Sequence, residues 1–190
     1  MNIKEAYLKY KKQLVILVSG LAGSGKTVVS KLIADDYEIT HLKLKDYFLD
    51  QHKLSKKFSF DAIDWDKVNQ EVDKLKHTGV IVSGLLFDDS KMTFNSDYNI
   101  HIKISKQNWL TNRSENLIKT NKENHEELMI TEKKDFNAIW YPYYLSNLNA
   151  SRIDKFYNIN ETDLDKLYND IFDQLSFFIK KSLDDLKTEQ

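Results

Sequence analysis

The sequence predicts an α/β protein in which a five-stranded parallel sheet is covered by helices on both faces. Three observations predict it. Apolar, strand-like runs alternate with helical patterns along the chain. A glycine-rich loop joins the first strand-like run to a helix-like run, and 190 residues with 41% hydrophobic content are enough for one compact core. We therefore expect a single domain over residues 1–190, with a small helical lid at about residues 106–140.

The glycine-rich loop carries a phosphate-binding pattern. Its sequence fits G-x-x-x-x-G-K-[ST] and stands between the apolar run 14–18 and the helix-like run 28–34, the context that this motif requires. Glycines let backbone N–H groups turn toward phosphate oxygens, and the next helix presents its N-terminus to the same anion. The pattern predicts a three-layer P-loop NTPase fold that binds the phosphates of a nucleotide together with Mg²⁺, and it does not distinguish ATP from GTP. The predicted nucleotide-binding residues are Gly20, Leu21, Ala22, Gly23, Ser24, Gly25, Lys26, Thr27 and Val28.

Within this loop, Lys26 and Thr27 have separate expected roles. Lys26 supplies a positive charge to the outer phosphates, which also makes it a predicted catalytic residue. Thr27 supplies a hydroxyl to the magnesium ion.

Hydrophobic periodicity places the other elements along the chain. The alternation at 39–44, the continuous apolar run 80–82, the alternation at 98–104 with its isoleucines on one face, and the segment 155–159 predict four further strands. Helical spacing predicts helices over 3–11, 26–36 and 64–77, with Asp64 as the N-cap of the last of these. The polar stretch 106–140 indicates two helices flanking a lid, and the final helix is expected to begin at a Thr162 cap.

Composition limits the partners and the compartment. The net charge of −1 gives no broad electrostatic footprint for nucleic acid or membrane, and no apolar run is long enough to span a bilayer. The chain has no cysteine, which is consistent with a reducing compartment. We expect a cytoplasmic protein that acts on a small-molecule substrate; the sequence indicates no oligomeric state. Its only arginines are Arg113 and Arg152.

Two other classes of phosphate-loop protein fit less well. A GTPase needs an N-K-x-D base reader after a strand, and the segment 121–124 lacks its carboxylate. A motor or AAA-type ATPase is usually longer and has an acidic residue at the end of the third strand, where this chain has Ser83. A small phosphotransferase suits the length better.

Five blocks of the sequence, in order, resemble the uridine kinase and nicotinamide riboside kinase family. Besides the phosphate loop they are K-D-Y-F-L-D-Q at 45–51, D-A-I-D-W-D at 61–66, V-I-V-S-G-L-L at 80–86 and Y-P-Y-Y-L at 141–145. The resemblance implies transfer of the ATP γ-phosphoryl group to a hydroxyl of a nucleoside or nucleoside-like substrate. It implies that Asp46, expected near the end of the second strand, accepts the hydroxyl proton and contributes to substrate and metal binding. A loop acid without a catalytic role is the alternative, and alignment on the aromatic pair places Lys45 at the position of the base.

The chain departs from this family at several positions. Ser83 stands where the family usually has glutamate, and Phe58 where it has an aspartate that holds sugar hydroxyls. Asp61 is a predicted substitute contact to the substrate, or else a solvated acid. Tyr144 is predicted either to line the acceptor pocket or to belong to the core. Arg113 is the predicted lid residue that clamps the transferring phosphate; a surface cation is the alternative.

These departures leave two alternatives to a nucleoside kinase. One is a nucleoside monophosphate or cofactor-precursor kinase, although an acceptor that carries a phosphate asks for more arginines. The other is a degenerate nucleotide-binding module that has kept the phosphate loop and lost the chemistry.

Overall fold

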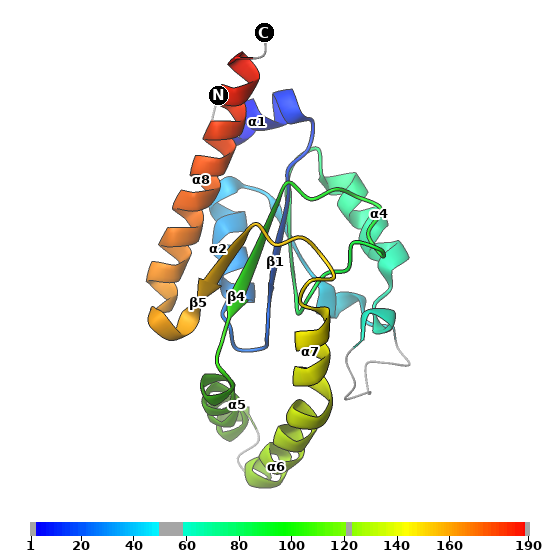
Figure 1. Ribbon diagram of the computed structural model, residues 1–190, viewed down its shortest axis with the longest axis vertical. Helices are drawn as coiled ribbons and strands as arrows, with labels where there is room; N and C mark the ends of the chain where they lie inside the picture. Colours follow the sequence, from blue (N-terminus) through cyan, green and yellow to red (C-terminus); the bar gives the residue numbers. More distant parts are fainter. Residues whose placement is uncertain (1–2, 50–58, 121–122, 189–190) are drawn as a thin grey trace.

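A five-stranded parallel sheet forms the centre of the molecule (Figure 1). The computed structural model describes residues 3–49, 59–120 and 123–188. The strand order is β2-β3-β1-β4-β5, so β1 lies in the middle between β3 and β4. The strands are β1 (Val15–Gly20), β2 (Thr40–Lys43), β3 (Val80–Gly84), β4 (Tyr98–Lys103) and β5 (Lys155–Asn158).

Helices lie between successive parallel strands except between β3 and β4, where residues 85–97 cross β1 without forming a helix. The α-helices are α1 (Ile3–Lys11), α2 (Lys26–Tyr37), α4 (Trp65–Leu75), α5 (Lys106–Thr120), α6 (His125–Asp135), α7 (Tyr141–Asn147) and α8 (Leu164–Thr188). Short 3₁₀ turns are η1 (Leu44–Tyr47), η2 (Phe60–Ala62) and η4 (Ile159–Glu161), and a π-helical turn, η3 (Phe136–Trp140), joins α6 to α7.

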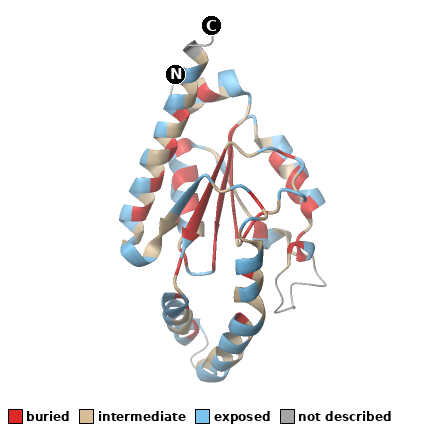
Figure 2. Cartoon of the chain, in the orientation of Figure 1, coloured by how far each residue is buried: buried red, intermediate tan, exposed pale blue. Residues whose placement is uncertain are grey.

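The sheet has a separate hydrophobic core on each face, and its central strands are buried throughout (Figure 2). One core packs α1, α2 and α8 against the sheet, and the other packs α4, α7 and the base of the lid against it. Because both faces are covered, β1 and β3 read as continuous apolar runs and not as alternating ones. The predicted three-layer α/β fold is confirmed.

The segment predicted to form a lid lies beyond the carboxyl ends of the strands (Figure 1). Helices α5 and α6 pack on each other there, and α6 continues through η3 into α7, which returns to the sheet. Trp109 of α5 and Phe136 of η3 stack with ring centroids 3.7 Å apart, and both rings are buried. A π turn is typically found at functional positions in helices, and here it lies at the base of the lid.

Local capping agrees with the sequence at one helix and differs at another. The Asp64 side chain accepts a hydrogen bond from the backbone N–H of Lys67 at 3.1 Å, which confirms the predicted cap of α4. The last helix begins at Leu164, near the predicted position, but the cap predicted at Thr162 is wrong, because Asp163 accepts from the N–H of Lys166 at 2.8 Å.

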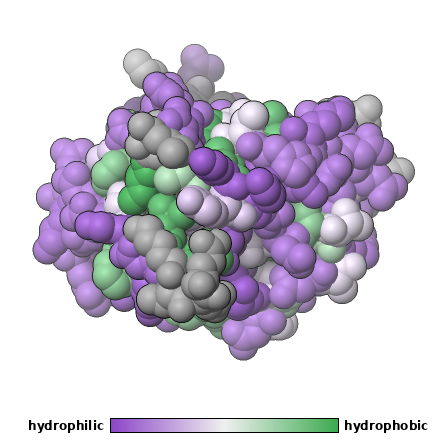
Figure 3. Space-filling view, turned by 90° about the horizontal axis from the view of Figure 1, so that it is seen from above, coloured by the Kyte–Doolittle hydropathy of each residue, from purple (hydrophilic) through white to green (hydrophobic). Residues whose placement is uncertain are grey.

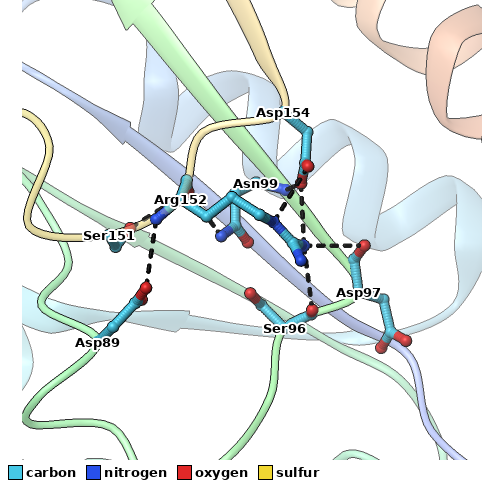
Figure 4. A network of polar contacts seen from close by, with 7 residues as sticks. All are labelled: Asp89, Ser96, Asp97, Asn99, Ser151, Arg152 and Asp154. Atoms are coloured by element: carbon cyan, nitrogen blue, oxygen red, sulfur yellow. Dashed lines mark hydrogen bonds and ion pairs between the residues drawn. The ribbon is translucent and has the colours of Figure 1, made fainter.

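The amino ends of β4 and β5 are held together by a polar network around Arg152 (Figure 4). Its guanidinium donates to the carbonyl oxygens of Ser96 and Asp97 and to the carboxylate of Asp154. Asp154 in turn accepts from the backbone N–H of Asn99, the second residue of β4. One of the two arginines therefore belongs to the edge of the sheet opposite the phosphate loop.

The surface seen from above in Figure 3 is mostly hydrophilic, with hydrophobic residues gathered in limited areas. Of the helices that the structure describes, none combines the length and the apolar character of a membrane-spanning segment.

Candidate nucleotide-binding site

The phosphate loop follows β1 and contains glycines in backbone conformations that other residues rarely adopt. Gly23 and Gly25 have φ values of +78° and +83°, and Gly25 is the residue that precedes α2. The N–H of Ser24 donates to the carbonyl of Leu21 at 3.1 Å, which closes the loop. The loop thus lies at the carboxyl edge of the sheet and at the N-terminus of α2, an arrangement suited to an anion.

Gly20 is fixed by a close approach of β4. A Cβ at this position would lie 2.6 Å from the carbonyl oxygen of Ile102, and φ is +156°. We expect Gly20→Ala to lower the free energy of unfolding by about 2 kcal/mol, because a backbone carbonyl cannot move aside as a side chain can. Gly23→Ala measures the cost of a positive φ (+78°) without a clash, since its nearest neighbour would be Asn112 Cβ at 3.6 Å, and we expect it to lose only about 1 kcal/mol. Urea denaturation measures both variants, and equal losses would contradict the steric argument.

Lys26 lies at the start of α2 and is partly buried. Its ammonium donates to the carbonyl oxygen of Leu21 at 3.2 Å. Burial, and secondarily the positive charge of Lys45, lower the pKa of Lys26 to about 8. Two cations are therefore held near each other at this edge of the sheet, which favours the binding of an anion between them.

The remaining loop residues divide by exposure. Leu21 and Ser24 are buried, Thr27 is partly buried, and Val28 is half exposed. The Ser24 hydroxyl is buried without a hydrogen-bond partner in the described part of the chain. This hydroxyl lies close to Gly20, where a Cβ would be 2.6 Å from it, so the loop is packed tightly on its inner side.

The turn η1 after β2 carries both residues that compete for the role of base. Asp46 and Lys45 are exposed. The charge of Lys45 acts on Lys26, whereas the charge of Asp46 acts on His41, whose Nε2 lies 2.9 Å from the Ser83 hydroxyl. Burial, followed by the charge of Lys43, lowers the pKa of His41. Ser83, at the position of the family's glutamate, thus forms a hydrogen bond with an imidazole.

Arg113 joins the two lid helices. Its Nε and Nη2 donate to the two carboxylate oxygens of Glu132 at 2.5 and 2.6 Å, a bidentate pair between α5 and α6. This carboxylate raises the pKa of Arg113. Because Arg152 lies at the opposite edge of the sheet, Arg113 is the only arginine among the lid and loop elements.

The predicted substrate contacts occupy different surroundings. Asp61 is exposed and pairs with Lys91 at 2.9 Å. Tyr144 is 5% exposed, and its hydroxyl lies 2.6 Å from His101 Nε2, as the alternative of a core residue predicted. Phe58, the proposed departure from the family's aspartate, lies outside the described residues.

Beneath the phosphate loop lies a buried polar chain that sequence reasoning missed. His101 of β4 is fully buried, with Ser19 Oγ 2.7 Å from Nδ1 and the Tyr144 hydroxyl 2.6 Å from Nε2. The Ser19 hydroxyl donates to the carbonyl of Ile100 at 3.2 Å, so it accepts from Nδ1–H, and the Tyr144 hydroxyl donates to Nε2. Histidine in an alternating strand was the available signal, but the alternation did not show that this face is buried.

The buried His101 gives the protein a pH dependence of stability. Burial, followed by the charges of Lys103 and Lys26, lowers the pKa of His101 from 6.5 to about 4. The unfolded chain therefore binds a proton that the folded chain rejects, and His101 lowers the free energy of unfolding by roughly 3 kcal/mol as the pH falls from 6.5 to 4. We expect His101→Gln to remove this part of the slope in denaturation measured across that range. The exposed His77→Gln is the control, and an unchanged slope in His101→Gln would contradict the prediction.

Magnesium, if it binds here, depends on few protein groups. Among the described residues, no three histidine or carboxylate side chains are grouped closely enough to hold a metal ion. Magnesium in nucleotide sites is commonly held by one or two side chains together with phosphates and water, so the Thr27 hydroxyl at the N-terminus of α2 is compatible with that arrangement.

Comparison with known proteins identifies the fold. No protein-family model matches the chain, and no curated protein sequence does. A shikimate kinase from Bacteroides thetaiotaomicron superposes with a TM-score of 0.53 at 14% identity, over 86% of this chain and 98% of that one. The chain has the fold of a P-loop kinase. An uncharacterized protein from Eubacterium ventriosum superposes with a TM-score of 0.50 at 15% identity, over 85% of this chain and 98% of the other.

Proposed function

We propose that this protein is an ATP- and Mg²⁺-dependent small-molecule kinase that transfers the γ-phosphoryl group to a hydroxyl of a nucleoside or nucleoside-like acceptor. The observation that carries the proposal is the phosphate loop with Lys26, placed at the carboxyl edge of a parallel sheet with a helical lid beyond it. Ligands of such sheets bind at this edge. The nucleoside class of the acceptor rests on the five sequence blocks.

The chain's own residues divide the work of transfer. The acceptor oxygen forms a bond to the γ-phosphorus as the bond from that phosphorus to the bridging oxygen of ADP breaks, and the acceptor proton passes to Asp46. Lys26 and the loop amides stabilise charge on the phosphate oxygens, since this reaction depends mainly on positioning and electrostatics. Thr27, with a contribution from Asp46, would hold Mg²⁺, which would supply further positive charge to the phosphates. Asp61 as an acceptor contact and Arg113 as a clamp on the transferring phosphate stay predictions, whereas the buried Tyr144, bonded to His101, fits the alternative of a core residue.

A monophosphate acceptor is disfavoured by the placement of the arginines. Arg152 is engaged at the amino edge of the sheet, and Arg113 is paired with Glu132. An acceptor with its own phosphate usually calls for bidentate guanidinium contacts.

An assay with ATP labelled at the γ-phosphate tests the proposal. The panel contains nucleosides, vitamins with a free hydroxyl, shikimate, and nucleoside monophosphates as the competing class. Phosphorylation of a nucleoside or nucleoside-like alcohol is the expected result. Labelled monophosphate acceptors alone would support the alternative kinase, and tight ATP binding with no labelled acceptor would support a degenerate binding module. We expect the native protein in the cytoplasmic fraction of cell extracts.

A further inference from the structure

A continuous path of packed rings runs from the lid to the phosphate loop. Trp109 and Phe136 stack at 3.7 Å, Phe136 contacts Tyr141 at 5.3 Å, and Tyr141 contacts Tyr144 at 6.0 Å between ring centroids. Tyr144 then stacks on His101 at 5.6 Å. The path begins on α5, crosses the π turn η3 and ends on β4, so the base of the lid is packed directly on the sheet.

At its sheet end this path becomes a chain of hydrogen bonds with a fixed direction. The Tyr144 hydroxyl donates to His101 Nε2, and His101 Nδ1–H donates to Ser19 Oγ. Ser19 is paired in register with His101, and it directly precedes Gly20, the first residue of the phosphate loop. His101 and Ser19 are 0% and 4% exposed, so water cannot replace these partners without opening the core.

We propose that His101 is a positioning residue that couples the lid to the phosphate loop through Tyr144 and Ser19. Movement of α7 with the lid displaces the Tyr144 hydroxyl, and the buried imidazole transmits that displacement to the strand end that sets Gly20. Asn112 of α5, whose side-chain amide lies 3.4 Å from the Gly23 carbonyl, provides a direct contact between the same two elements. The inference rests on the proposed function in that it assumes a nucleotide in the phosphate loop.

Hydrogen–deuterium exchange of the lid tests the coupling in the full-length protein. The readout is the slowing of exchange in residues 106–120 and 125–135 on addition of a saturating non-hydrolysable ATP analogue with Mg²⁺. Tyr144→Phe keeps the stacked ring and removes only the hydroxyl. The control is Tyr143→Phe, on the same helix as Tyr144. The Tyr143 hydroxyl accepts a hydrogen bond from the backbone N–H of Phe60 at 2.9 Å. We expect the analogue to slow lid exchange about tenfold in the native protein and in Tyr143→Phe, and to have little effect in Tyr144→Phe.

Equal slowing in Tyr144→Phe and the native protein would overturn the proposal. A merely structural hydroxyl would lower the unfolding midpoint of either variant without changing the difference that the nucleotide makes. Ser19→Ala, which removes the other partner of His101, is the second variant if Tyr144→Phe does not fold, and the same loss of slowing is expected. Protonation of His101 at Nε2 and not Nδ1 in a long-range ¹H–¹⁵N NMR spectrum would also overturn it.

These outcomes separate the coupling from the kinase activity. A protein that binds the analogue and slows its lid, yet phosphorylates no acceptor, refutes the proposed function and retains the coupling. One that phosphorylates an acceptor while Tyr144→Phe behaves like the native chain refutes only the coupling. An analogue that is shown by titration to bind, and that leaves exchange of the native lid unchanged, refutes the coupling; an analogue that does not bind refutes the proposed function.

Discussion

Lys26→Met is expected to lower kcat for phosphoryl transfer by about a thousandfold, because the lysine supplies fixed positive charge where charge shifts in the transition state. Its ammonium lies at the start of α2 and is held by the Leu21 carbonyl. The measurement is steady-state transfer from labelled ATP to the best acceptor of the panel. Lys31→Met, at an exposed position on the same helix, is the matched control and should keep its kcat.

Loss of folding does not explain the expected effect. The fold disfavours the charge on Lys26, since burial and Lys45 lower its pKa to about 8. Replacement by an uncharged side chain of similar length should therefore leave the free energy of unfolding equal to or above that of the native chain. Native-like turnover in Lys26→Met would show that Lys26 does not contribute to phosphoryl transfer. A large loss of stability would show that the surroundings of Lys26 favour its positive charge.

Interactions between near neighbours in sequence were predictable. The phosphate loop, the Asp64 cap and the buried strand β3 each depend on residues within a few positions of one another. The cap of α8 shows the limit of this reasoning. Thr162 and Asp163 are both suitable N-cap residues. Which of them caps α8 depends on how the helix packs on the rest of the protein, where Leu164 contacts Gly25 of the phosphate loop.

Pairings across the sheet and the lid were not predictable from the pattern. The alternation at 98–104 identified the isoleucine face of β4, but His101 on the other face is buried as well, because α7 covers it. Its partners Ser19 and Tyr144 lie 82 and 43 positions away. The pair between Arg113 and Glu132 likewise depends on how α5 and α6 pack. Hydrophobic spacing indicates which residues are buried and gives no information on which ones meet.

Asp46→Asn is expected to lower kcat by about a hundredfold or more while leaving the affinity for ATP unchanged, because a general base contributes to the transfer step and not to nucleotide binding. The exposed Asp46 lies on η1, where β2 ends, at the same edge of the sheet as the phosphate loop. Titration with an ATP analogue measures the affinity, and single-turnover transfer measures the chemical step. Asp66→Asn, an exposed acid in the first turn of α4, is the matched control.

The neighbouring Lys45 provides a second test, because the family alignment places either Asp46 or Lys45 at the position of the base. The charge of Lys45 acts on Lys26, whereas that of Asp46 acts on His41. If Asp46 is the base, Lys45→Met should weaken ATP binding through the lost phosphate charge and leave the chemical step close to native. If Lys45 occupies the position of the base, the pattern reverses: Asp46→Asn keeps its single-turnover rate and Lys45→Met loses it. The two single substitutions thus assign the turn by opposite effects on binding and chemistry, since adjacent residues of a 3₁₀ turn point in different directions.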